Sequence, residues 1–243
     1  MVKPSQLFEQ VSIMSLSFFI HFYGEAKHGA ALCGDAEARL RNLRTELGTK
    51  CSIILHSPLA VSGNDPLPVA QDERMLLCQL FLPDDRMPAD VANEIAAGLS
   101  GLEGAEGVRR VHSHVMATER LRAGSPDDLR APAKAVSFFV QYDGPAQDPE
   151  AFHAYYRSHH VPIVFRMPGI RAVAYHLPTP FAGPAIGHVV SRLQIVQAVF
   201  NSSDDFVAMR KSGERKEGLR DFENYPKFEG AVTHQVMDSR RID

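Results

Sequence analysis

An aromatic pattern occurs twice in this chain, 120 residues apart, and this repeat constrains the fold more than any other feature. Ser17–Gly24 reads SFFIHFYG and Ser137–Gly144 reads SFFVQYDG. At the same spacing, His56-Ser57-Pro58 corresponds to His176-Leu177-Pro178. Two later matches keep this order: Leu77–Phe81 with Ile195–Val199, and Val115-Met116 with Val236-Met237. The common order predicts an internal duplication, in which each copy is one structural unit.

Each copy has the pattern of a β-α-β-β-α-β unit. In the second copy, Asp148 and Pro149 form a helix start after the strand 136–142, and Met167-Pro168-Gly169 ends that helix. We expect its other elements in this order: strands at about 172–177 and 192–200, a helix capped by Ser203 or Asp204, and a strand at about 231–237. In the first copy, helices are expected near 36–47 and 89–99.

The expected fold class is therefore α+β, with two ferredoxin-like units fused in tandem. The first unit covers residues 11–119 and the second covers 135–243, and a linker rich in Pro, Gly and charge covers 120–134. Side chains alternate along a strand, so Phe18 and Phe19 point to opposite faces, as do Phe138 and Phe139. Both faces then need cover, which predicts two sheets packed face to face as a barrel within one chain.

The segment at 148–163, DPEAFHAYYRSHHVPI, followed by Met167-Pro168-Gly169-Ile170, resembles the EthD family of the dimeric α+β barrel superfamily. The shared features are an acidic helix cap, a Phe, a Tyr-Tyr pair, a His-x-Pro and a Pro-Gly. The family is usually a single unit that dimerises through its sheets, so this chain resembles a tandem-fused version. The first copy has only Leu40–Leu47 at this place, without His or aromatic residues. The family's site residues are therefore carried onto the second copy alone.

The resemblance implies a small-molecule pocket between sheet and helices. Members and relatives of the family include small isomerases, cofactor-free oxygenases, accessory proteins of ether and aromatic breakdown, and haem proteins. The resemblance makes His160 the functional histidine, with Tyr156 or Tyr155 beside it. A histidine exchanges protons near neutral pH, and a tyrosine donates a hydrogen bond to an oxyanion. This implies a cofactor-free isomerase, lyase or monooxygenase that acts on a small organic catabolite.

The helical wheel and the family pattern disagree about which histidine faces the pocket. The wheel places His159 on the apolar stripe and His160 at its edge, whereas the family pattern selects His160. Both stay candidate catalytic residues, together with Tyr156. The candidate substrate-binding residues are Phe152, Tyr155, Phe139, Gln141, Arg166 and Gln197. Structural roles are open for all of them, since buried tyrosines often only pack and buried amides often bridge strands.

No metal site is predicted. His112 and His114 share one face of a strand, and His234 lies in the corresponding strand of the second copy, but no carboxylate completes a ligand set. Neither a glycine-rich phosphate loop nor a G-x-S-x-G motif is present. Two alternatives to an enzyme remain: a non-catalytic ligand-binding or accessory protein, and a haem-binding barrel with His160 as axial ligand.

The composition limits the classes of partner and the cellular compartment that we expect for this chain. The net charge of −3 and the pI of about 6.4 argue against binding to nucleic acid or to an anionic membrane. The apolar run Val11–Tyr23 is too short to span a membrane. The three cysteines form no C-x-x-C pair, which favours a reducing, cytoplasmic compartment. We expect a small-molecule ligand, a barrel formed within one chain, and room for further homo-oligomerisation.

Overall fold

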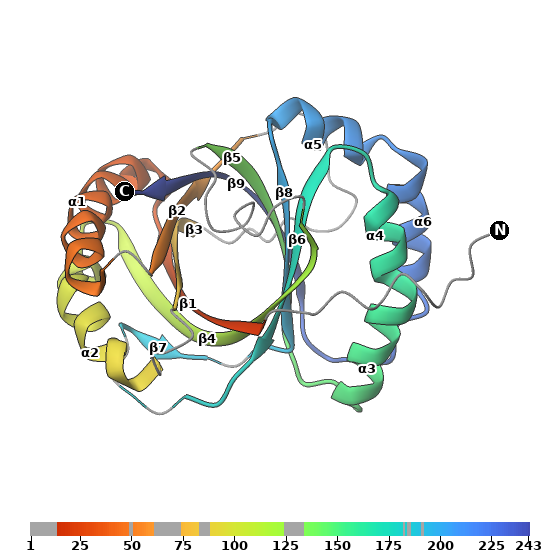
Figure 1. Ribbon diagram of the computed structural model, residues 1–243, viewed down its shortest axis with the longest axis horizontal. Coiled ribbons are helices and arrows are strands. Elements are labelled where there is room, and N and C mark those ends of the chain that lie inside the picture. The colour runs from red at the N-terminus through yellow and green to blue at the C-terminus, as the bar shows by residue number, and fades with distance from the viewer. Residues whose placement is uncertain are drawn as a thin grey trace.

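The computed structural model describes residues 14–48, 51–60, 74–82, 88–123, 134–181, 183, 186–190 and 192–243. Its strands form one sheet in the order β1-β3-β2-β9-β5-β8-β6-β4-β7, and β1 also pairs with β4. That last pairing closes the sheet into a barrel, which lies between two layers of helices (Figure 1). The fold is thus a mixed α+β barrel.

The first half of the chain contributes four strands and one helical layer. Its main elements are β1 (Met14–Gly24), α1 (Gly29–Leu47), β2 (Ser52–Pro58), β3 (Arg74–Phe81), α2 (Pro88–Gly98) and β4 (Val108–Ala123). The apolar run near the N-terminus is therefore largely a barrel strand, since β1 begins at Met14. Among the helices of the described residues, none combines the length and the apolarity that a membrane crossing requires.

The second half repeats the order β-α-β-β-α-β with two additions, β7 and α6. Its elements are β5 (Ala135–Tyr142), α3 (Pro149–Tyr155), the π-helix η4 (Tyr156–His160), α4 (Val161–Arg166), β6 (Ile170–Pro178), β7 (His188–Val189), β8 (Gln194–Phe200), α5 (Ser203–Arg210), α6 (Gly213–Phe222) and β9 (Val232–Ile242). The Asp148 side chain caps α3 by accepting the Ala151 N–H at 2.9 Å, as its sequence position predicts. Ser202, one residue before the expected cap, caps α5.

The two halves join through strand edges at two places. β2 pairs with β9, and β4 pairs with β6, both antiparallel. β4 is 16 residues long, so its first part can pair with β1 and its last part with β6. The expected arrangement of two separate sheets packed face to face is therefore corrected: one continuous sheet closes on itself, and the inner faces of its halves meet across the interior.

The expected linker is shorter than its sequence suggests. Residues 120–123 continue β4, and Lys134 directly precedes β5. Residues 124–133 lie outside the described part of the chain. A strand continues into the charged segment because Arg120, Arg122 and Ala123 pair with residues of β6 across the junction.

The barrel interior receives one side chain of each aromatic pair. Phe19 and Phe139 point inward and pack with Leu77, Met116, Ile195 and Met237. Phe18 and Phe138 point outward and belong to the clusters under the two helical layers. All four rings are buried, with exposed fractions of 7% or less. The alternation thus supplies both the barrel core and the two outer cores.

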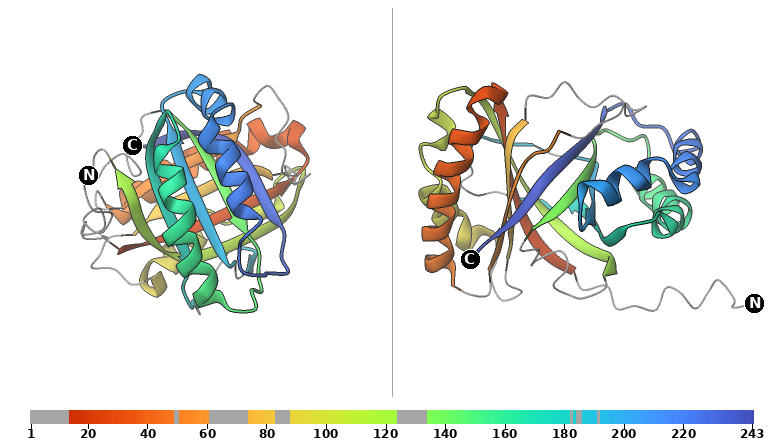
Figure 2. Two further views of the ribbon diagram at one scale, coloured as in Figure 1. Left: turned by 90° about the vertical axis from the view of Figure 1, so that its right-hand side faces the viewer. Right: turned by 90° about the horizontal axis from the view of Figure 1, so that it is seen from above.

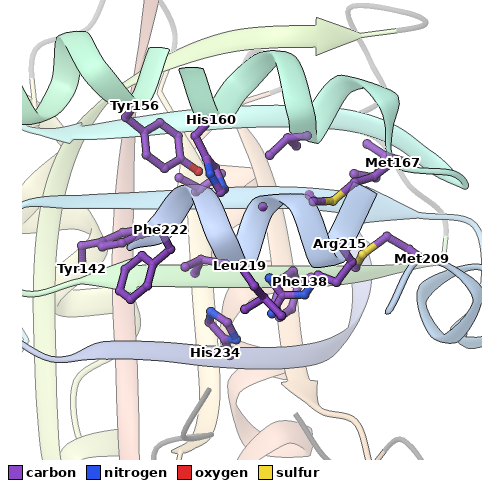
Figure 3. Close-up of a pocket in the computed structure, with 16 residues that line it drawn as sticks. Phe138, Tyr142, Tyr156, His160, Met167, Met209, Arg215, Leu219, Phe222 and His234 are labelled. Carbon is purple, nitrogen blue, oxygen red and sulfur yellow. The ribbon is translucent and has the colours of Figure 1, made fainter. Parts of the chain in front are cut away.

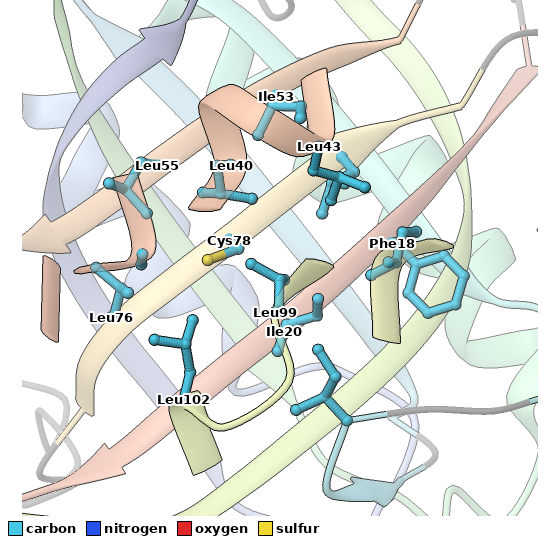
Figure 4. Packing of buried hydrophobic residues seen from close by; sticks show 14 of the residues in the cluster. Phe18, Ile20, Leu40, Leu43, Ile53, Leu55, Leu76, Cys78, Leu99 and Leu102 are labelled. Carbon is cyan, nitrogen blue, oxygen red and sulfur yellow. The ribbon is translucent and has the colours of Figure 1, made fainter. Parts of the chain in front are cut away.

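The two helical layers differ in the side chains they bury. Under α1 and α2, leucines such as Leu40 and Leu43 pack on the aliphatic outer face of β2 and β3 (Figure 4). Under the helices of the second half, aromatic side chains pack among the aliphatic ones, including Phe152, Tyr156 and Phe206. In Figure 2, α3 and α4 form one line of helix beside α6, and together they cover the sheet of the second half.

Candidate active site

A small cavity lies between α6, the α3–α4 helix and the outer face of the sheet. Its volume is about 50 Å3. Figure 3 shows side chains from both helices and from the strands below converging on it. The lining residues are mostly apolar: Phe138, Val140, Tyr142, Tyr156, His160, Val164, Met167, Ile170, Val196, Ala198, Met209, Arg215, Gly218, Leu219, Phe222 and His234.

A π-helical turn at Tyr156–His160 decides which histidine reaches the cavity. A π turn holds more residues than an α turn, so a wheel drawn for an ideal α-helix assigns the wrong angle to the residues that follow. His160 is only 9% exposed and lines the cavity. His159 is exposed, and its ring stacks on Tyr155 with centroids 4.2 Å apart. The wheel's preference for His159 is thus wrong, and His159 is corrected to a surface residue.

Asp221 of α6 holds the His160 ring in place. His160 Nδ1 lies 2.8 Å from Asp221 Oδ2, and the Tyr155 hydroxyl donates to Asp221 Oδ1 at 3.0 Å. A carboxylate accepts, so Nδ1 carries the proton and Nε2 keeps a free lone pair in the neutral ring. Orientation of a histidine by a buried carboxylate is the arrangement that general bases use. Tyr155, a candidate substrate-binding residue, thus contacts Asp221 instead.

Burial lowers the pKa of His160 below 6.5, the hydrogen bond and the charge of Asp221 raise it in part, and Arg215 lowers it again. The ring is therefore neutral near pH 7, which is the state that accepts a proton. The neighbouring Tyr156 is buried, with its ring centroid 4.9 Å from that of His160. Burial raises the pKa of Tyr156 well above 10, so this hydroxyl stays protonated and can donate a hydrogen bond.

Helix α6 is not among the elements expected from the sequence, although the sequence carries a signal for it. Ser212 caps the helix by accepting the Arg215 N–H at 3.1 Å. Arg215, Leu219 and Phe222 follow at i, i+4 and i+7, which is the helical spacing of one face. This face lines the cavity, and Arg215 brings the cation found among its walls. Asp221 was missed with the helix, since nothing local relates it to a histidine 61 residues earlier.

Gly218 lets α6 approach the histidine closely. A Cβ atom at this position would lie 3.3 Å from Met167 Cε and 3.4 Å from His160 Cε1. An added Cβ would therefore crowd Met167 and lie in contact with the imidazole ring. The glycine fixes the separation between α6 and the π-helical turn, and with it the geometry of the His160–Asp221 pair.

Three candidate residues point away from this cavity. The inner face of the barrel carries Phe139, Gln141 and Gln197. Side chains alternate between the two faces along a strand, and the residues next to these three in sequence point outward. Phe139 packs on His56 with ring centroids 5.1 Å apart. Gln141 Nε2 donates to Asp143 Oδ1 at 3.3 Å, and Gln197 accepts from Gln79 Nε2 at 3.2 Å. Their predicted contact with a substrate in the helical pocket is wrong.

Two further candidates lie near the cavity without lining it. Phe152 is fully buried and packs on Tyr142, with ring centroids 5.7 Å apart, so it supports the cavity wall from behind. Arg166 is half exposed and forms an ion pair with Glu217 at 2.6 Å on the surface. The prediction that Arg166 meets a substrate in this cavity is therefore corrected, and Arg215 occupies that position.

The histidines considered for metal binding lie on different faces. His112 and His114 share the inner face of β4, whereas His234 lies on the outer face of β9 at the floor of the cavity. The described residues contain no group of three His, Cys, Asp or Glu side chains that could hold a metal ion. A haem does not fit the cavity as it is packed, because a cavity of about 150 Å3 is needed for benzene alone and this one has about 50 Å3.

The comparisons with known proteins agree with this architecture. The sequence model of the EthD domain matches residues 144–226, which include the whole π-helical turn and α6. No curated protein matches the sequence. The crystal structure of an anthrone oxidase-like protein has a TM-score of 0.52 and 14% identity, and the match covers 94% of this chain and 93% of that one. At this identity the likeness shows the barrel fold alone.

Two other solved structures are less similar in their coordinates. Chlorite dismutase from Candidatus Nitrospira defluvii has a TM-score of 0.48 at 12% identity, over 97% of this chain and 95% of that one. An ethyl tert-butyl ether D (EthD) family protein from Bacillus halodurans C-125 has a TM-score of 0.34 at 18% identity, over 42% of this chain and 95% of that one. The sequence comparison therefore shows a match to the EthD domain over residues 144–226 of this chain.

Proposed function

We propose that this protein is a cofactor-free acid–base enzyme of the isomerase or lyase type, acting on a small organic molecule in the cavity beside α6. The observation that carries the proposal is the His160–Asp221 pair, which places a neutral, oriented imidazole in the wall of an apolar cavity. Buried, perturbed and specifically partnered histidines are typical of general bases.

Each polar group has one role in this chemistry. His160 Nε2 takes a proton from a carbon next to a carbonyl group, and the electron pair of that C–H bond moves to the carbonyl oxygen. Asp221 keeps the required tautomer and stabilises the imidazolium that forms. Tyr156 and Arg215 lie in the same wall and stabilise the oxyanion of the enolate. Return of the proton to another carbon completes an isomerisation, and loss of a β-leaving group completes an elimination.

The size and lining of the cavity limit the substrate. Its volume of about 50 Å3 admits only a few atoms as packed, whereas benzene needs about 150 Å3. Met167 and Met209 line the walls, and the flexible methionine side chain yields to a ligand more readily than a branched one. We therefore expect a compact, partly apolar carbonyl compound, with methionine rotation when a ring enters.

A first experiment measures exchange of carbon-bound protons in D2O for a panel of small cyclic ketones and lactones, followed by proton NMR. His160→Asn should lower the exchange rate by about 100-fold or more, the usual contribution of one general base. His159→Asn is the matched control, because this exposed neighbour should leave the rate unchanged. Loss of exchange in His159→Asn with retention in His160→Asn would contradict the proposal.

The alternative of a non-catalytic binding or accessory protein rests on the apolar walls, which suit ligand storage as well as turnover. The two functions differ in what His160 does. In an enzyme, His160→Asn lowers turnover more than affinity, and in a binding protein it lowers affinity while no panel compound exchanges protons. The proposed setting is the cytoplasm, because the three cysteines form no C-x-x-C pair and are free.

We also infer that the chain arose by duplication of one ferredoxin-like unit, and the strand registers support this. Phe19 lies opposite Gln79 in β3, and Phe139 lies opposite Gln197 in β8. At the two junctions between the halves, His56 lies opposite Ser239, and His176 lies opposite Thr118. Phe19 and Phe139 are 120 residues apart, as are His56 and His176, and the spacing of the facing residues is 118 for Gln79 and Gln197 and 121 for Thr118 and Ser239.

The side chains inside the barrel follow the same internal symmetry. His56 bonds to Ser239 at 2.7 Å and His176 bonds to Thr118 at 2.9 Å, both through Nδ1. These hydroxyls in turn bond to the first serine of each aromatic repeat, Ser137 at 2.9 Å and Ser17 at 2.8 Å. Buried polar networks need every member satisfied, and two matching networks are what duplication of one ancestral unit leaves behind.

A further inference from the structure

A second cavity lies where the barrel wall is interrupted along β4. This strand pairs with β7 at His112 and Ser113 and with β6 from Met116 onward. Between these pairings, no strand of the described residues pairs with that edge of β4 at His114 and Val115. A cavity of about 260 Å3 opens at this interval, several times larger than the cavity beside α6. We call it the wall cavity, lined by His114, Val115, Met116, Pro178, Thr179, Pro180, Phe181, Val189, Val190 and Arg192.

Two residues that line the wall cavity, His114 and Arg192, carry buried atoms without a hydrogen-bond partner, and His21 packs on His114. His21 is 1% exposed, and neither of its ring nitrogens has a partner among the described residues. His114 packs edge-on against His21 with ring centroids 4.8 Å apart, and its Nε2 atom also lacks one. The Arg192 Nε–H is a third such group. Buried polar groups are nearly always hydrogen-bonded, so this cluster indicates a polar ligand or water.

The charge around His21 selects the sign of that ligand. Burial lowers the pKa of His21, and the next causes are all cationic or histidine groups: Arg74, His114, Arg192 and His112. No carboxylate is among the groups that shift the pKa of His21. The nearby Asp143 forms an ion pair with Arg192. The potential here is therefore positive, which repels a metal cation and attracts an anion.

We propose that the wall cavity binds a small organic carboxylate with an apolar body. The Arg192 Nε–H in the cavity wall supplies a donor for the carboxylate, and a charge-assisted hydrogen bond of this kind is a strong one. Met116, Pro178 and Phe181 supply an apolar surface for the rest of the molecule. The volume suffices, because 260 Å3 exceeds the roughly 150 Å3 that holds a benzene ring.

The experiment titrates the full chain with benzoate while nitrogen-15 NMR follows the histidine rings. Benzoate should move the ring signals of His21 and His114 and leave those of His160 in place. Benzyl alcohol, which has the same ring without the charge, should bind at least 10-fold more weakly. Arg192→Met should weaken benzoate binding by at least 10-fold, whereas His160→Asn, in the other cavity, should leave it unchanged.

Two further variants keep the result interpretable. Arg192→Lys retains the positive charge beside Asp143 but loses the Nε–H, and should give an affinity between those of the parent and Arg192→Met. Arg41→Met removes an exposed arginine elsewhere and should change nothing. Three outcomes would each overturn the proposal. The first is that benzoate shifts the signals of His160 alone, and the second is that benzyl alcohol binds as tightly as benzoate. The third is that Arg192→Lys and Arg192→Met both fold and bind benzoate with full affinity.

Discussion

The two helical layers of this barrel bury side chains at equivalent positions, but these side chains have different roles. Counting 120 residues on from each buried residue of α1 gives a buried residue of the α3–α4 helix or of its C-cap: Leu32 and Phe152, Ala36 and Tyr156, Leu40 and His160, Leu43 and Ile163, Leu47 and Met167. The first layer is packed by leucines and alanine, and the second places aromatic rings and a histidine at equivalent positions.

The difference shows what a buried histidine requires of its surroundings. Leu40 needs only close packing, which its neighbours on β2 and β3 provide (Figure 4). At the equivalent place, His160 needs a hydrogen-bond partner, and α6 supplies Asp221. The second layer accordingly has a π-helical turn and an additional helix, which the main elements of the first layer lack in the described residues. The polar site thus depends on structure that a purely packed layer does not need.

The largest expected effect comes from separating the halves. Residues 135–243 alone would leave β9 without β2 and β6 without β4, and would expose inward residues such as Phe139 and Met237. Open strand edges and apolar faces associate, so this half should form a dimer or larger species in sedimentation. A stable, soluble monomer would show that the second layer does not depend on the first.

Acid should next destabilise the interior that both halves share. Burial lowers the pKa of His56, His114 and His176 to about 3 in the folded protein. The unfolded chain takes up these protons near pH 6.5, so stability is complete above that pH and falls as the pH drops toward 3. Each such histidine contributes a slope of about 1.4 kcal/mol per pH unit. Urea unfolding from pH 7 to pH 5 should show the fall, and a constant free energy of unfolding would contradict it.

Truncation of a core side chain should lower the free energy of unfolding more in the first helical layer than in the second. Leu43→Ala removes a fully buried side chain from the packed layer and should cost about 2–5 kcal/mol of unfolding free energy. Met167→Ala, at the equivalent face of the second layer, borders an existing cavity and should cost less. Both losses are measured by urea unfolding. A larger loss for Met167→Ala would mean that the second layer is packed as tightly as the first.

The smallest expected effect comes from Gly218→Ala. The new methyl group meets Met167 Cε at 3.3 Å, so this side chain must move by a few tenths of an ångström, and it takes up cavity space beside His160 Cε1 at 3.4 Å. Turnover should fall several-fold, while the gain in helix propensity keeps stability within about 1 kcal/mol. Gly213→Ala is the matched control on the same helix, because nothing lies within 4 Å of its added Cβ. Equal turnover by the two variants would show that Gly218 has no influence on the catalytic site.

The sequence by itself determined the parts of this protein that depend on local chemistry and period. The repeat predicted two β-α-β-β-α-β halves, and the Asp148-Pro149 pair predicted where α3 begins. The His-x-Pro segment lies within residues 144–226, which match the EthD domain. Strand alternation also required that both Phe18 and Phe19 be buried, although it left open which ring faces the barrel interior.

Only the tertiary structure decided the geometry of the site. The π-helical turn that brings His160 inward is a small change in helix period, which a wheel for an ideal α-helix does not contain. Asp221 reaches His160 from 61 residues away, through a helix whose approach depends on Gly218. Gln141 and Gln197 face the barrel interior because the sheet closes through two junctions between distant strands. Long-range pairings of this kind follow from packing the whole chain, so no local pattern specifies them.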